Sequence, residues 1–236
     1  MRAVILAGGR GARDGSGEAR RNPLLRRCEG ETCGSLERQL QLLSEAAVPA
    51  VVVTGSDHRA VAPLVRRYGG ETIFDGGTRD SSPFSLYCAA RVFRTEETIL
   101  LEGCLWIDRA TLDAALMSEA HACLMDEAVS ARDVLISGMA GVVEQFICDP
   151  LRGGYPANLA CFAGRSQGIY HLRASTQFAQ FLEEKREAET HIEAMNLLVS
   201  AEGMVYVRNF GLWRNVNRGV APAGGIEPGN QAGANP

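Results

Sequence analysis

Lysine is almost absent from this sequence of 236 residues, in which Lys185 is the only one. Positive charge in a binding site must therefore come almost wholly from arginine. No apolar run approaches the roughly 20 residues that a membrane-spanning helix needs, and the first apolar stretch, residues 3–7, is too short for the core of a signal peptide. We expect a soluble cytoplasmic protein that makes no contact with a membrane.

Paired cysteine motifs are missing too. The seven cysteines are an odd number spread along the chain, no Cys-x-x-Cys occurs, and no two histidines stand at zinc spacing. These absences argue against a disulfide framework and a zinc site, and favour thiols that serve as small core residues in a reducing compartment. The net charge of -4 argues against a nucleic-acid-binding protein, which usually carries a basic face.

The first third of the chain alternates strand and helix patterns. Short apolar runs at 2–7, 50–54 and 72–74 are typical of buried parallel strands. The segments 35–43 and 57–68 have apolar residues at helical spacing. This alternation predicts an α/β fold with a mostly parallel, Rossmann-like central sheet flanked by helices, in which the carboxyl ends of the strands form one ligand-binding edge.

The remainder of the chain is less regular. A fourth strand is expected at 98–102, between helices at 82–94 and 109–117. Further on, the patterns predict short strands at 134–137, 142–147 and 157–162, which form a mixed second sheet on the substrate side. A helix charged in its middle is expected at 176–200, and a last strand at 204–207. We expect one domain over 1–218 and a disordered tail over 219–236, where glycine, alanine, proline and asparagine follow no apolar period.

A glycine-rich segment, LAGGRGAR over residues 6–13, directly follows the first strand. Glycines let the backbone approach a phosphate chain, and successive N–H groups form an anion-binding concavity. Arg13 can add a charge-assisted bond to a phosphate. No Gly-Lys-Ser/Thr follows, as a Walker A loop would require, and a long arginine-rich loop stands where a Rossmann fingerprint would begin its helix. The segment is a candidate phosphate-binding loop, with a plain glycine turn as the alternative.

This segment resembles the signature loop of the sugar-phosphate nucleotidyltransferases with the GT-A-like fold, which reads L-A-[AG]-G-x-G-[ST]-R. The sequence NPL at 22–24 stands where that family has Lys-Pro-Leu, and LLEGC at 100–104 stands where it has an apolar strand ending in Gly-Asp or Ala-Asp. FSLY at 84–87 is similar to the Asn-x-x-Ser-Leu stretch of the phosphocholine and phosphonate cytidylyltransferase branch. WRNVN at 213–217 lies where a final Asp or Asn closes the metal site.

The resemblance implies an enzyme that moves a nucleotidyl group, most simply CMP from CTP, to a small phosphorylated or phosphonate metabolite and releases pyrophosphate. It implies Mg²⁺ as the cofactor and is compatible with a homodimer. The residues that it assigns to the nucleotide are Leu6, Ala7, Gly8, Gly9, Gly11, Arg13, Ser82 and Ser85. The residues that it places at catalytic positions are Arg13, Arg21 and Asn22.

Three positions depart from the family pattern. Asn22 replaces a phosphate-contacting lysine, Cys104 replaces the first metal aspartate, and Asn217 replaces the second. A thiol is a poor ligand for Mg²⁺. Glu102, on the same strand, and Asp108, further along the loop, can substitute as metal ligands.

Two hypotheses of different class therefore stay open. In one, the chain is an active nucleotidyltransferase with a rearranged metal site, in which arginines such as Arg21 replace the missing lysine charge. In the other, it is a non-catalytic relative that binds a nucleotide as a regulatory or partner subunit.

Overall fold

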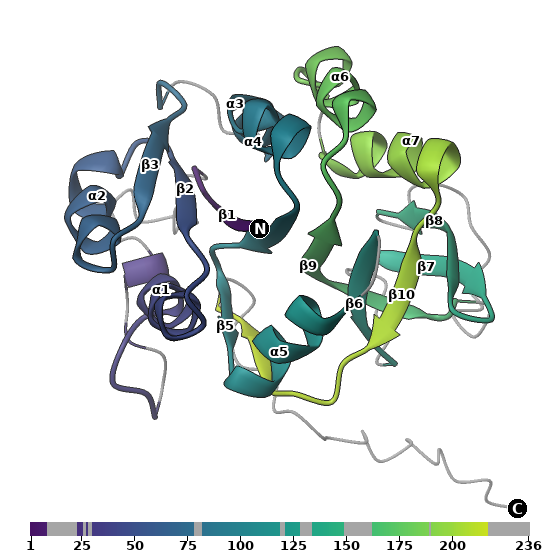
Figure 1. Cartoon of the computed structure of the whole chain (residues 1–236). Coiled ribbons are helices and arrows are strands. Elements are labelled where there is room, and N and C mark those ends of the chain that lie inside the picture. The colour runs from purple at the N-terminus through teal and green to yellow at the C-terminus, as the bar shows by residue number, and fades with distance from the viewer. Residues whose placement is uncertain are drawn as a thin grey trace, which may run out of the picture.

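The computed structural model describes residues 1–8, 23–25, 27, 30–77, 82–118, 121–127, 134–148, 162–188 and 190–216. Within this part of the chain, a nine-stranded sheet runs through the molecule (Figure 1). Its strands are β1 (Arg2–Ala7), β2 (Ala50–Thr54), β3 (Glu71–Phe74), β4 (Thr98–Glu102), β6 (Ala122–Asp126), β7 (Leu135–Met139), β8 (Val142–Ile147), β9 (Gly164–Leu172) and β10 (Val205–Arg208).

The strands lie in the order β3-β2-β1-β4-β9-β6-β10-β8-β7. The first four run parallel, whereas β9 is antiparallel to both β4 and β6. The predicted α/β class with a mostly parallel first half is confirmed. The mixed strands of the second half continue the central sheet, and the separate sheet is a two-stranded antiparallel ribbon of β5 (Leu105–Ile107) and β11 (Trp213–Asn215).

Helices cover both faces of the sheet. Helices α1 (Ser35–Glu45), α2 (His58–Arg67) and α5 (Arg109–Met117) share one apolar core with Ile5 and Leu101. Helices α3 (Ser82–Cys88), α4 (Ala90–Thr95), α6 (Thr176–Glu184) and α7 (Ile192–Glu202) share the other with Val4 and Leu100. Adjacent residues of β1 and β4 thus point into opposite cores, as the period of a strand requires. None of the described helices is long and apolar enough to cross a membrane.

Two predicted helices are each divided in the structure. The segment 82–94 forms α3 and α4, which are separated by a turn at the buried Ala89. The segment 176–200 forms α6 and α7, because the charged run 183–187 offers no apolar side chain to the core and the chain turns before Ile192. Strands β5, β6, β9 and β11 were not predicted, and most of the expected strand at 157–162 lies outside the described residues.

Helix α1 is attached to the turn between β4 and β5 by two fully buried polar side chains. Ser35 Oγ donates to the carbonyl oxygen of Gly103 at 2.9 Å. One helical turn further on, Gln39 Nε2 donates to the carbonyl oxygens of Glu102 at 3.0 Å and Leu105 at 2.5 Å. Gly103 lies in the turn itself, and Glu102 and Leu105 are the strand residues on either side of it, so the α1 side chains satisfy carbonyl groups at and next to this turn.

We predict that Gln39→Ala lowers the free energy of unfolding by about 2–4 kcal/mol, because it leaves two buried carbonyls unpaired and opens a cavity. The matched control is Gln41→Ala on the same helix, whose partly exposed side chain bonds to Glu45. We expect that control to change the unfolding free energy by about 0.5 kcal/mol or less. Urea denaturation measures both, and equal effects would contradict the role assigned to Gln39.

His191, directly before α7, sits in the core with its ring edge-on to Tyr170. Burial lowers the pKa of His191 from its ordinary 6.5 to about 4. Between pH 6.5 and pH 4, His191 is therefore protonated in the unfolded chain but neutral in the folded chain. Stability is therefore complete above pH 6.5 and falls as the pH drops toward 4, by up to about 1.4 kcal/mol per pH unit.

We predict that His191→Gln makes the unfolding free energy less dependent on pH between 6.5 and 4. The control is Gln41→Ala on α1, which removes no titratable group and is expected to keep the wild-type pH dependence. Denaturant titrations at half-unit pH intervals provide the comparison. An unchanged slope in the His191 variant would show that other groups account for the acid sensitivity.

Candidate functional site

The candidate site lies where β1, β2, β3 and β4 end together. At the end of β1, the side chains of Leu6 and Ala7 point into the two cores. A ligand at this edge can therefore meet these two residues mainly through their backbone. Gly8 follows directly and opens the predicted phosphate loop, of which Gly9, Gly11 and Arg13 lie outside the described residues.

Gly8 is in close contact with two buried polar side chains. A Cβ atom on Gly8 would lie 2.5 Å from Asp75 Oδ2 and 2.6 Å from Ser85 Oγ, so a side chain at this position would displace these two groups. Ser85 Oγ donates to Asp75 Oδ2 at 3.0 Å, and the N–H of Gly77 donates to Asp75 Oδ1 at 2.9 Å. The structure thus brings the predicted Ser85 to Gly8, together with an acidic residue that the sequence analysis missed. Ser82 opens the same helix, α3.

The ends of the parallel strands touch through their backbones. A Cβ on Gly55, after β2, would lie 2.1 Å from the carbonyl oxygen of Gly8. Similarly, a Cβ on Gly103, after β4, would lie 2.7 Å from the carbonyl oxygen of Leu6, which accepts the Gly103 N–H at 2.9 Å. Glycine at these positions allows a close approach that any side chain would prevent.

Glu102 and Cys104 are the neighbours of Gly103 in the chain, one before it and one after it. The Cys104 thiol donates to Glu102 Oε2 at 3.7 Å. The Glu102 carboxylate rests against Gly168 of β9, where a Cβ would lie 2.8 Å from Glu102 Cδ. Gly168 has a φ of +73°, a conformation that glycine adopts without strain. The two predicted metal positions are thus adjacent, and their groups are bonded to each other.

Asp108 has a structural function. Its carboxylate caps α5 by accepting the N–H of Thr111 at 2.8 Å, and it accepts the N–H of Leu212 at 2.9 Å. Burial raises the pKa of Asp108, but the backbone N–H groups of Leu212 and Thr111 outweigh that effect, and the pKa is lower than usual. Each carboxylate oxygen thus accepts one backbone N–H, and the substitute metal role predicted for Asp108 stays a prediction.

The chain returns to Cys104 immediately before Asn217. Strand β11 pairs with β5, with Asn215 opposite Leu105, and the N–H of Val216 donates to the carbonyl oxygen of Cys104 at 2.8 Å. Asn217, Arg21 and Asn22 lie outside the described residues, so their predicted roles stay predictions.

The described residues offer part of the ligands of the expected Mg²⁺ site. Next to Gly103 they provide one carboxylate, from Glu102, and one thiol, from Cys104. In the described part of the chain no group of three or more His, Cys, Asp or Glu residues could hold a metal ion. Mg²⁺ is commonly bound through one or two carboxylates together with substrate phosphates, so Glu102 suits it as a ligand and the Cys104 thiol is a poor one.

Neither a protein-family model nor a curated protein sequence matches the chain. Solved structures do match. They include UDP-glucose pyrophosphorylase from Acinetobacter baumannii, at 15% identity over 92% of this chain and 88% of that one, with a TM-score of 0.66. The inositol-1-phosphate CTP transferase from T. maritima matches at 13% identity over 90% and 87%, with a TM-score of 0.71. The CTP:phosphocholine cytidylyltransferase from Streptococcus pneumoniae matches at 13% identity over 92% and 93%, with a TM-score of 0.68. At such identities the likeness establishes the fold, and the chain has the α/β fold found in these nucleotidyltransferases.

Proposed function

We propose that this chain binds a nucleoside triphosphate, CTP in preference, at the carboxyl edge of β1 to β4. We propose further that it transfers the nucleotidyl group to a small phosphorylated or phosphonate acceptor. The observation that carries the proposal is the contact of Gly8 with the Asp75–Ser85 pair at that edge. Ligands of open α/β sheets bind beside the carboxyl ends of the strands. The three nucleotidyltransferases described above share the fold over most of their length.

The preference for CTP is supported by the chemistry of Asp75. A carboxylate only accepts hydrogen bonds, and each of its oxygens accepts more than one. Ser85 and Gly77 each occupy one position on Asp75, which leaves further acceptor positions. Cytosine presents an exocyclic amino donor, whereas uracil presents a carbonyl acceptor at the same place. A base next to Asp75 is therefore favoured if it is cytosine and disfavoured if it is uracil.

In the proposed reaction, a phosphate or phosphonate oxygen of the acceptor attacks the α-phosphorus of the triphosphate. A new P–O bond forms, the bond from the α-phosphorus to the bridging oxygen breaks, and pyrophosphate leaves with that electron pair. Phosphoryl transfer of this kind depends on positioning and on neutralisation of phosphate charge. The chain's contributions are the backbone at Gly8, the base contact at Asp75, and arginine charge from the loop that holds Arg13 and Arg21.

A second candidate function is nucleotide binding without transfer. The observation that favours it is the thiol of Cys104 at the first metal position, bonded to the one carboxylate beside it. Such a chain would sense the nucleotide or present it to a partner, and its affinity for nucleotide would not depend on Mg²⁺.

We predict that Asp75→Asn reverses the base preference. The amide can present an N–H to the carbonyl of uracil, so the ratio of CTP to UTP affinity is expected to fall by about tenfold or more. Isothermal calorimetry with CTP, UTP, GTP and ATP measures it. The control is Asp113→Asn, in an exposed ion pair with Arg109 on α5. An unchanged CTP to UTP ratio in the Asp75 variant would remove Asp75 from the base site.

We also predict that Cys104→Asp makes nucleotide binding dependent on Mg²⁺, because it adds an oxygen ligand beside Glu102. CTP affinity in this variant is expected to rise by about tenfold with Mg²⁺, about 1.4 kcal/mol. Cys104→Ser, which has the same size but adds no carboxylate, is expected to show no such rise.

Pyrophosphate release with phosphorylated acceptors, measured on the wild-type chain and on Cys104→Asp, separates the two candidate functions. Release by the wild-type chain supports the transferase. Binding by the wild-type chain, with release only from Cys104→Asp, supports the binding protein. No nucleotide binding by either chain would refute both.

A further inference from the structure

The segment 209–216 joins the end of β10 to β11 and reaches the candidate site; we call it the return segment. It leaves the central sheet after Arg208, passes the start of α5, and ends beside Cys104 through the bond from the Val216 N–H. Figure 1 shows β11 beside β5, at some distance from β10. The return segment therefore crosses from β10 in the central sheet to β11 in the two-stranded ribbon.

Its first half is held by polar groups of β9, of β6, and of α5 with its N-cap residue. Asn209 Nδ2 donates to Gln167 Oε1 of β9 at 2.9 Å and to Thr111 Oγ1 of α5 at 3.1 Å. The backbone N–H of Asn209 donates to the carbonyl oxygen of Met125 at the end of β6 at 2.9 Å. Asp108 accepts the N–H of Leu212. These bonds hold the crossing against the central sheet and α5.

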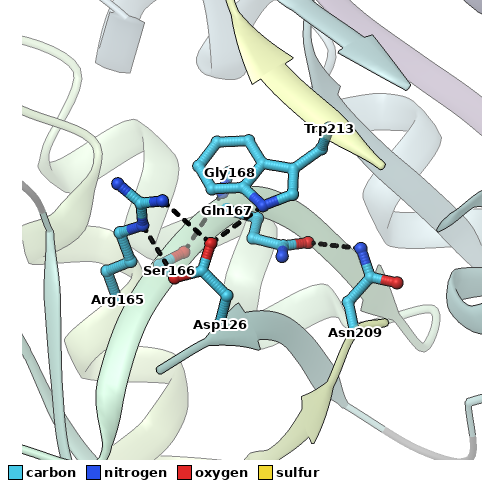
Figure 2. Close-up of polar contacts among 7 residues, drawn as sticks. All are labelled: Asp126, Arg165, Ser166, Gln167, Gly168, Asn209 and Trp213. Atoms are coloured by element: carbon cyan, nitrogen blue, oxygen red, sulfur yellow. Dashed lines mark hydrogen bonds and ion pairs between the residues drawn. The ribbon is translucent and has the colours of Figure 1, made fainter. Parts of the chain in front are cut away.

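Its second half is held through one carboxylate, that of Asp126 (Figure 2). Trp213 Nε1 donates to Asp126 Oδ2 at 2.9 Å. Arg165 of β9 donates to the same carboxylate through Nε at 2.8 Å and Nη2 at 3.0 Å, and its guanidinium carbon lies 4.8 Å from the centre of the Trp213 ring. The bidentate pair gives Asp126 a definite orientation, because the guanidinium fork matches a carboxylate in one plane.

The position of Trp213 determines where the rest of β11 lies. Trp213 pairs with Ile107 and Asn215 pairs with Leu105, so the two strands of the ribbon share one register as far as Cys104. A shift of one residue in an antiparallel pair turns every side chain to the opposite face. With three residues in each strand, the ribbon's own backbone bonds are few, and a side-chain attachment at its start has a large effect on its register.

We propose that Asp126 is a positioning residue for the candidate site. Acting through Trp213, it fixes the register of β11 and so holds the chain that leads to Asn217 against Cys104. The proposal rests on the proposed function for its effect on turnover. Asp126 is on the face of the sheet that packs against α5, and it contacts β11 through Trp213.

The test uses two variants of the full chain. Trp213→Phe removes the indole N–H and keeps an aromatic ring under Arg165, and Asp126→Asn keeps the size of the side chain and removes its charge. Both are expected to lower kcat for pyrophosphate release by about tenfold, with KM for CTP within about twofold, because the base contact at Asp75 is undisturbed. The matched control is Asp113→Asn, which removes another Asp–Arg pair and is expected to leave both constants unchanged.

Amide hydrogen exchange provides a second measurement that does not need turnover. Both variants are expected to speed exchange at the Val216 amide by about tenfold, with no change in β1, because local opening there becomes easier. If the wild-type chain binds no nucleotide or gives no turnover, the proposed function fails, and the positioning of β11 is judged on exchange alone. Unchanged protection at Val216 overturns the proposal, and so does a lower melting temperature with kcat and exchange both unchanged.

Discussion

The candidate site depends on a contact between backbones. The ends of β1, β2 and β4 approach so closely at Gly8, Gly55 and Gly103 that a methyl group at any of them would overlap a neighbouring backbone or side-chain atom. Parallel strands normally stand about 4.8 Å apart and keep that distance along their length. Just beyond the last strand bonds, glycine lets the three chains converge further. The convergence therefore places Gly8, which contacts the Asp75–Ser85 pair, directly against Gly55 after β2.

Attachments from outside the sheet hold this convergence in place. Gln39 and Ser35 of α1 bind the turn after β4 from one side, and the bond from Val216 to Cys104 approaches that turn along the chain from β11. A turn with satisfied carbonyls opens rarely, because each buried polar group that loses its partner costs free energy. Glu102 and Cys104, on either side of Gly103, thus have a rigid base although they lie at a strand end.

The sequence predicted the parallel half of the sheet well, because β1, β2 and β4 are continuous apolar runs with turn residues after them. It did not predict β5 and β11, since three residues carry no detectable period and these strands exist only by pairing with each other. Strand β9 was missed because His171, Gln167 and Ser166 interrupt its apolar pattern. In the candidate site, the resemblance to the nucleotidyltransferases pointed to Ser85 as a nucleotide-binding residue. Asp75 was missed, because a single acidic residue after a short strand has no motif and only the fold brings it to Gly8.

The three departures from the family pattern have electrostatic effects that are consistent with one another. In a site built for Mg²⁺, two carboxylates hold the cation and the cation neutralises the triphosphate. Without the cation, those carboxylates would repel the phosphates, and at 4 Å two like charges cost about 4 kcal/mol where the effective dielectric constant is 20. Cys104 and Asn217 remove that repulsion, while the loop of residues 8–27 is rich in arginine. The absence of a lysine at position 22 weakens the attraction for phosphate. The absence of both aspartates removes the repulsion that a lysine there would have to offset. Under the second candidate function proposed above, the three substitutions together lower the dependence of triphosphate binding on a metal, which no one of them would do alone.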